Sequence, residues 1–227
     1  MPATPLRLPT VPANERARAR RLYAKLQGLY PNAHCALHYR SPFQLLIATI
    51  LSAQCTDEAV NKATPALFAA YPDAHAMAQA PVADLERLVK TCGFYRNKAK
   101  NLLASSQLLV SDFDSQVPQT IHDITRLPGA ARKTANVVLG NAYNINQGMV
   151  VDTHIGRLSV RLGLTQHDSK NAKKIEPDLI ARFPQHTWTT LAHLLIAHGR
   201  AVCKAQRPQC STCPLKRSCP KINVTNP

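Results

Sequence analysis

No long alternation of Val, Ile and Thr with polar residues occurs along the chain, whereas Ala and Leu are abundant. Half-buried strands need such an alternation, so the pattern favours helices throughout. Polar capping residues, Gly and Pro mark where each helix is expected to begin and end. Longer helices are predicted over residues 14–29, 42–51, 95–110, 118–127, 131–142, 153–162, 171–183 and 188–202. We therefore predict an all-α fold.

The residues that flank the apolar segments predict individual helix ends. Ser41 and Pro42 supply a cap and a first-turn proline for the strongly apolar segment that ends at Leu51, which we expect in the core. Asn14 and Thr153 are the expected caps of two further helices. Two or three shorter helices are predicted within residues 58–71 and 73–90, broken at Pro65, Tyr71-Pro72 and Pro81.

Charge changes this picture, because the formal net charge is +15 with only 13 acidic residues. A polyanionic partner is the economical explanation, and a protein that is basic for another reason is the alternative. No apolar run reaches the roughly 18 to 20 residues that a membrane span needs. The proline-rich residues 1–13 and the arginines that follow could form an organelle-targeting leader, but we interpret them as a short tail before a basic helix.

Residues 127–157 have the outline of a helix-hairpin-helix. Pro128 and Gly129 break an amphipathic segment, and small and β-branched residues follow over residues 131–142. Backbone N–H groups at a helix start can bind a phosphate without reading bases. Lys133 lies in the first turn, where the positive field favours the neutral, nucleophilic amine, and Asp152 lies beside a further predicted helix start. The alternative is a solvated lysine and an aspartate that only caps a helix.

Two further segments are candidates for DNA contact. Gln54 lies in a run of small polar residues after the apolar helix, which can also be a turn followed by a cap. Phe94 and Tyr95 follow Gly93, and the basic residues Arg96 and Lys98 come next. Apolar wedges beside basic groups suit unstacking a base step, whereas packing of Phe94 on the core is the alternative.

Four of the seven cysteines form the series C-x6-C-x2-C-x5-C: Cys203, Cys210, Cys213 and Cys219. Four thiolates this close can surround one metal centre, and the spacing alone leaves zinc and an iron-sulfur cluster about equally plausible. Disulfides are disfavoured in an intracellular helical protein.

Three motifs together resemble the endonuclease III family of DNA glycosylases. They are Leu-Pro-Gly-Ala-Ala-Arg-Lys-Thr-Ala followed by Val-Asp-Thr-His, the run Ser-Ala-Gln-Cys-Thr-Asp, and the terminal cysteine spacing. The resemblance implies that Lys133 is the covalent nucleophile and Asp152 its partner, and that the four cysteines hold a [4Fe-4S] cluster. It also implies that Gln54 enters the space left by an everted nucleotide. The chain departs from the family at Ala131, where the second hairpin glycine is expected, and at Phe94, where leucine is usual.

The resemblance further implies two helical domains with a cleft between them, at whose mouth Lys133 and Asp152 meet. We expect a six-helix domain with the hairpin over residues 35–145, and a second domain, with the cluster loop, from residues 1–34 and 146–227. The expected DNA contacts are Gln54, Phe94, Tyr95, Arg96, Lys98, Gly129, Ala131 and Arg132.

The implied function is that of a bifunctional DNA glycosylase and abasic-site lyase for oxidised pyrimidines. Its expected partner is double-stranded DNA with damaged bases or abasic sites. We expect a monomer in the cytoplasm of a bacterium, associated with the nucleoid and not with a membrane. The alternatives are a monofunctional glycosylase, such as the adenine glycosylases, which lack the hairpin lysine, and a non-catalytic DNA-binding or redox-signalling iron-sulfur protein.

Overall fold

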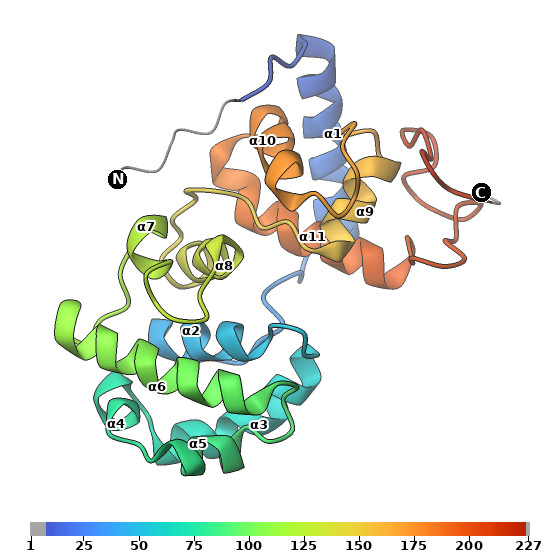
Figure 1. Ribbon diagram of the computed structural model, residues 1–227. Coiled ribbons are helices and arrows are strands. Elements are labelled where there is room, and N and C mark those ends of the chain that lie inside the picture. Colours follow the sequence, from blue (N-terminus) through green and yellow to red (C-terminus); the bar gives the residue numbers. More distant parts are fainter. Residues whose placement is uncertain (1–7, 226–227) are drawn as a thin grey trace. The chain divides into compact units, whose positions relative to one another are not determined.

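The computed structural model describes residues 8–225, and within them every regular element is a helix (Figure 1). The predicted all-α class is therefore confirmed. The helices are α1 (Ala13–Leu29), α2 (Pro42–Leu51), α3 (Asp57–Ala70), α4 (Ala74–Ala78), α5 (Val82–Leu88), α6 (Tyr95–Asp112), α7 (Ile121–Ile124), α8 (Arg132–Ala142), α9 (Thr153–Arg161), α10 (Ala172–Arg182), the 3-10 turn η1 (Gln185–Thr187) and α11 (Trp188–Ala201). No helix of the described part is long and apolar enough to cross a membrane.

The chain forms two compact units, one of which is the continuous segment Cys35–Gln147 with helices α2 to α8. Helix α2 is its centre, because all of its residues from Phe43 to Leu51 are buried except Gln44. It packs against α3, α6 and α8. Ser41 Oγ accepts a hydrogen bond from the Gln44 N–H at 3.2 Å, which confirms the predicted cap.

The other unit combines the described residues before Cys35 with those from Gly148 onward. It contains α1, α9, α10, η1 and α11, and α9 packs on both α10 and α11. Its core includes Leu26, Ile155, Leu158 and Leu195, and Leu215 belongs to it although the surrounding segment is a loop. A buried leucine in the loop fastens the cysteine segment to the helices.

Several predicted boundaries were wrong, for local reasons. Pro65 does not break a helix but lies inside α3, where it is exposed while the opposite face packs inward. The predicted helix 118–127 shortens to α7, because Thr120 Oγ1 accepts from the Asp123 N–H at 3.0 Å and sets a later start. Pro12, not Asn14, precedes α1. Of the proline-rich tail, residues 1–7 lie outside the described part.

Candidate functional site

The hairpin turn between α7 and α8 needs glycine at one of its two motif positions only. Gly129 has a φ of +82°, which L-residues with a side chain rarely adopt. A Cβ there would lie 2.9 Å from Asn101 Nδ2 and 3.1 Å from Ile50 Cγ2. Ala131, by contrast, has a φ of −96° and a ψ of 174°, an extended conformation open to any residue. The departure at Ala131 therefore costs the hairpin no backbone strain.

Hydrogen bonds hold the turn against α6 and close it. Ser105 Oγ donates to the carbonyl of Pro128 at 2.7 Å, and the Ala130 N–H donates to the carbonyl of Leu127 at 3.0 Å. Ser105 is fully buried, so the anchor lies in the core of the unit. The turn is thus a rigid platform from which α8 begins.

Helix α8 begins with features that suit an anion. Its cap, Ala131, has no side-chain oxygen, so no cap side chain occupies the N–H groups of the first turn. That turn contains no acidic residue but two basic ones, Arg132 and Lys133. The Lys133 side chain is exposed. The helix dipole adds positive potential at the same place, so this end can bind a phosphate oxygen.

Asp152 is itself the cap of α9, a role the sequence assigned to Thr153. Its Oδ1 accepts from the Ile155 N–H at 2.8 Å, and Thr153 is the first residue of the helix. Asp152 is half-buried, and its Oδ2 makes no hydrogen bond within residues 8–225. The carboxylate is therefore held in one orientation by the cap and keeps one oxygen for other chemistry.

The two loops proposed to enter DNA lie side by side in the unit Cys35–Gln147. A Cβ on Gly93 would lie 3.5 Å from the Gln54 carbonyl oxygen. Gln54 has a φ of +52° and Phe94 a φ of +57°, so both adopt the left-handed conformation, which is uncommon for such residues. Both side chains are exposed, Phe94 to 68%. Phe94 does not pack on the core, so the alternative interpretation of this residue is wrong.

The basic residues that follow Phe94 at the start of α6 differ in their exposure to solvent. Tyr95 is half-buried, and Arg96 is exposed with its guanidinium carbon 5.4 Å from the Tyr95 ring centroid. Lys98 differs from the prediction, because only 5% of its surface is exposed and its Nζ is buried. A buried Nζ cannot reach a phosphate backbone in this conformation, so the expected DNA contact by Lys98 does not form.

The four C-terminal cysteines line one cavity, together with apolar residues such as Leu215 and Val202. All four thiols are half-buried. Burial and the three neighbouring thiols raise the pKa of Cys219. Proximity of this kind is what a shared centre requires.

The sequence left two metal centres open, and the four thiols are suitable donors for both. A structural zinc ion takes four thiolates, and a four-iron cluster is held by four cysteine thiolates. The residues that line the cavity therefore fit either centre.

Polar contacts that the sequence did not single out hold the cysteine loop to the helices. Arg161 Nη1 lies 3.4 Å from Cys203 Sγ and donates to the Lys204 carbonyl at 2.7 Å. His198 Nε2 lies 3.6 Å from Cys213 Sγ, and its Nδ1 lies 2.9 Å from the Tyr30 hydroxyl. Arg161 belongs to the helix predicted over residues 153–162, but the sequence of this helix did not show where its arginines point.

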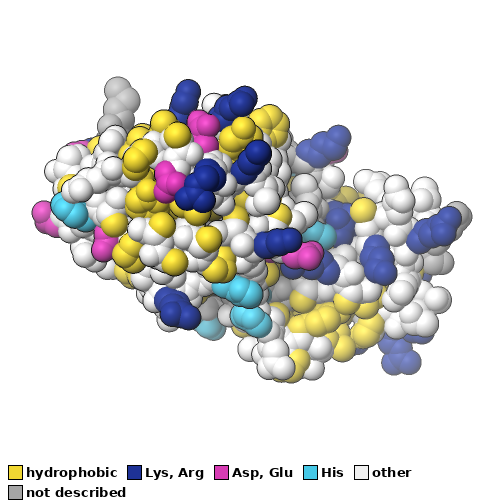
Figure 2. Space-filling view, turned by 90° about the horizontal axis from the view of Figure 1, so that it is seen from below, with side chains coloured by type: hydrophobic (Ala, Val, Ile, Leu, Met, Phe, Trp, Pro, Cys, Tyr) yellow, Lys and Arg dark blue, Asp and Glu magenta, His cyan; other side chains and the backbone are white. Residues whose placement is uncertain are grey.

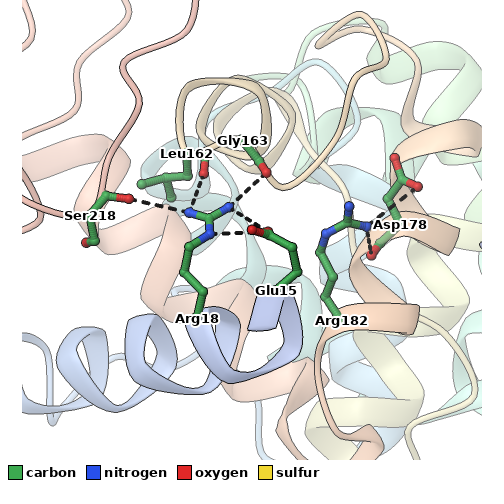
Figure 3. A network of polar contacts seen from close by, with 7 residues as sticks. All are labelled: Glu15, Arg18, Leu162, Gly163, Asp178, Arg182 and Ser218. Atoms are coloured by element: carbon green, nitrogen blue, oxygen red, sulfur yellow. Dashed lines mark hydrogen bonds and ion pairs between the residues drawn. The ribbon is translucent and has the colours of Figure 1, made fainter. Parts of the chain in front are cut away.

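A further arginine links the start of α1 to the same loop (Figure 3). Arg18 donates to the carbonyls of Leu162 and Gly163 at 3.0 and 2.9 Å and to that of Ser218 at 3.4 Å. Glu15 accepts from its Nε at 3.2 Å. The end of α9 and the residue before Cys219 are thus fixed by one side chain.

His154 is a packed, hydrogen-bonded residue. It is half-buried, and its Nδ1 lies 3.2 Å from Arg157 Nη2. The same guanidinium group donates to the carbonyls of Gly199 and Cys203 at 3.1 and 3.0 Å. These contacts account for His154 without a catalytic role.

Comparison with known proteins places this site in a family. The model of the HhH-GPD superfamily of base excision DNA repair proteins matches residues 47–185. An endonuclease III of Synechocystis is 50% identical over 94% of this chain and 96% of its own length. The chain belongs to the endonuclease III family. The resemblance inferred from the three motifs is therefore confirmed.

Other relatives agree with this assignment. An endonuclease III of Escherichia coli is 35% identical over 90% of this chain and 95% of its own length. A solved structure of a trapped covalent intermediate contains an endonuclease III bound to DNA, and the sequence of that protein is 39% identical to this chain. The two structures match with a TM-score of 0.85 over 91% of this chain and 96% of the other. The similarity thus extends over both units and is not limited to the hairpin motif.

Proposed function

We propose that the protein is a bifunctional DNA glycosylase and abasic-site lyase of base excision repair, acting on oxidised pyrimidines. The observation that carries this proposal is Lys133, an exposed amine in the first turn of a helix whose start suits a phosphate. A solved relative forms a covalent intermediate with DNA, which is the kind of intermediate that a lysine nucleophile produces.

Binding to duplex DNA rests on charge and on the two exposed loops. Lys and Arg side chains outnumber Asp and Glu on the face shown in Figure 2, in line with the net charge of +15. The hairpin residues Gly129, Ala131 and Arg132 bind the backbone, and the damaged nucleotide leaves the stack. Gln54 fills the space that it vacates, while Phe94 enters the duplex as an apolar wedge, flanked by Tyr95 and Arg96.

The chemistry is carried by Lys133 and Asp152. The Asp152 carboxylate helps to generate the neutral amine of Lys133 and stabilises positive charge that develops on the sugar. The neutral amine attacks C1′ and the C1′–N bond to the damaged base breaks. Opening of the sugar gives a Schiff base, from which loss of the C2′ proton expels the 3′ phosphate by β-elimination. One covalent intermediate thereby joins base removal to strand cleavage.

Cys203, Cys210, Cys213 and Cys219 hold a [4Fe-4S] cluster in this proposal. When bound, the cluster is a crosslink that orders a loop too short to have its own core. Arg18, Arg157 and Arg161 fix the loop from the helices, and the basic residues of the loop face phosphates. The protein acts as a monomer on nucleoid DNA.

The matched variants Lys133→Gln and Asp152→Asn test the assignment on a duplex with one thymine glycol. Lys133→Gln is expected to lose both base release and strand cleavage. Asn caps a helix as well as Asp, so Asp152→Asn should keep its unfolding midpoint yet lose activity. Base release without cleavage by Lys133→Gln would indicate a monofunctional glycosylase, and unchanged activity of Asp152→Asn would indicate that the residue only caps α9.

A further inference from the structure

Three arginines line a small hollow beside α1 and α10 that has no place in the proposed chemistry. Arg16 and Arg20 come from α1 and Arg182 from the end of α10, and Phe183 and Pro184 form part of the wall. The cavity measures 180 Å³. One water molecule needs only about 10 to 15 Å³, so a phosphate group with ordered water fits inside. All of the lining residues belong to the unit that contains the cysteine loop.

The positive charges contributed by α1 are not balanced by acidic side chains. Arg16 and Arg20 lie one helical turn apart and are exposed, and neither side chain has a hydrogen bond or an ion pair within residues 8–225. Like charges at this spacing destabilise a helix. Glu15 is the only acidic residue of α1, and it pairs with Arg18 at 3.2 Å. An anion held between Arg16 and Arg20 would remove their repulsion.

Arg182 is held in place but keeps one donor without a partner (Figure 3). Its Nη1 donates to the Asp178 carbonyl at 3.0 Å and lies 3.8 Å from Oδ1 of the same residue. The other carboxylate oxygen of Asp178 accepts from the Thr165 hydroxyl. Arg182 Nε is buried and has no hydrogen-bond partner within residues 8–225. The ion pairs of the described residues thus give the three guanidinium groups a single carboxylate, so the hollow stays net positive.

The wall of the hollow is rigid and apolar. Phe183 is 3% exposed and belongs to the core of its unit. Its carbonyl accepts from Trp188 Nε1 at 2.9 Å, and the Pro184 carbonyl accepts from the Thr187 hydroxyl at 2.7 Å. Charges beside an apolar surface are screened less than charges in open water. Because the wall is already fixed, little ordering is needed when an anion binds.

The hollow is separate from the surface of the cysteine loop. Arg18 contacts that loop, since it donates to the Ser218 carbonyl at 3.4 Å. It lies two residues from both Arg16 and Arg20, and residues two apart on a helix do not face the same way. Helix α1 therefore presents one face to the cysteine loop and another to the hollow.

We propose that this hollow binds a phosphodiester group of the duplex DNA backbone. Guanidinium groups donate paired hydrogen bonds to phosphate oxygens, and a duplex offers one negative charge per about 1.7 Å of its axis, which neighbouring arginines can share. The lining side chains are Arg, Ala, Phe and Pro, so none of them offers an acceptor to a base edge or a peptide N–H. The contact is therefore independent of base sequence and adds affinity for undamaged and damaged DNA alike. The choice of DNA as the partner rests on the proposed function.

Arginine modification of the full-length protein tests whether DNA occupies the hollow. Phenylglyoxal reacts with accessible guanidinium groups, and fragmentation in a mass spectrometer assigns each modified residue. An undamaged duplex should suppress modification of Arg16 and Arg20 and also of Arg132 in the hairpin. Arg40 is the control, because it is exposed and precedes α2, whereas the Gln54 loop follows the other end of that helix.

The pattern of protection separates this proposal from the proposed function. Protection of Arg132 without protection of Arg16 and Arg20 would overturn binding in the hollow and leave the proposed function standing. Modification of all three arginines at the rate seen without DNA would contradict DNA binding itself, and with it the proposed function.

Salt dependence measures what the hollow contributes to affinity. Arg16→Gln/Arg20→Gln should bind an undamaged duplex about 3- to 30-fold more weakly at low salt, because two exposed ion pairs are lost. The slope of log K against log salt should become shallower by about 2. Lys173→Gln/Lys174→Gln, at exposed positions in the first turn of α10, removes the same charge and should change both quantities less.

Two outcomes of the affinity measurement would overturn the proposal. Equal losses in the two double variants would show that net charge, and not the hollow, determines affinity. Unchanged duplex affinity of Arg16→Gln/Arg20→Gln, together with a loss of binding to polyglutamate, would assign the hollow to an acidic protein instead of DNA.

Discussion

Replacing Gly129 with alanine should damage the hairpin, whereas replacing Ala131 with glycine should not. At Gly129 the φ of +82° is unfavourable for alanine, and the new methyl would lie 3.1 Å from both Asn101 Cβ and Ile50 Cγ2. The backbone penalty is about 1 to 2 kcal/mol and the overpacking penalty about 1 to 3 kcal/mol. Ile50 is buried in α2, so the contact cannot be relieved by a side chain moving into solvent.

Urea unfolding followed by far-ultraviolet circular dichroism measures this cost. With a slope of about 2 kcal/mol per molar urea, Gly129→Ala should lower the midpoint by about 1 to 2.5 M. Ala131→Gly should change the stability by less than about 0.5 kcal/mol, because the preference for glycine at a cap opposes its greater chain entropy. A midpoint for Gly129→Ala equal to that of the wild type would refute the argument from the turn geometry.

Three further predictions follow from contacts and charges in the structure. Gly156→Ala should destabilise the protein by about 1 to 3 kcal/mol, because a Cβ there would overlap the Ser169 carbonyl oxygen. Gly28→Ala is the control, because a Cβ at Gly28 would have open space around it. Equal urea midpoints for the two variants would contradict the predicted overlap. Arg161→Ala removes part-buried hydrogen bonds to the loop and should lower stability by about 2 to 4 kcal/mol and speed the loss of absorbance of the proposed cluster. Arg87→Ala, which removes an exposed ion pair, should cost less than about 1 kcal/mol. Equal rates of absorbance loss in the two variants would argue against the role of Arg161. Burial raises the pKa of Cys92 from 9.0 to about 11. The contribution of the neutral Cys92 thiol to the free energy of unfolding is therefore complete below pH 9 and is lost as pH rises toward 11. Urea midpoints measured under reductant should fall more steeply across this range in wild type than in Cys92→Ala, and parallel curves would contradict the shift.

Helices and their capping polar residues were largely predictable because they depend on local sequence. Ser41 and the apolar segment after it gave both the cap and the central core helix of one unit. Pro65 shows the limit, because a proline on an exposed helix face is tolerated when the opposite face is packed on the core. Which face is buried depends on tertiary contacts that the local sequence does not reveal.

The site was predictable as a set of motifs but not as a set of contacts. The sequence raised the question of Ala131, and only its φ of −96° answered it. Lys98 looked like one of several basic residues at a helix start, yet its Nζ is buried. Arg18 contacts carbonyls more than a hundred residues away, and no local pattern announces a contact of that kind.

Borohydride trapping on a duplex with one thymine glycol tests the central claim most directly. The wild type and Lys62→Gln, a control at an exposed lysine of α3, should form a covalent adduct that peptide mapping places on Lys133. Lys133→Gln should form none. Trapping of Lys133→Gln at the wild-type yield would contradict the account, because the Schiff base would then form on another amine.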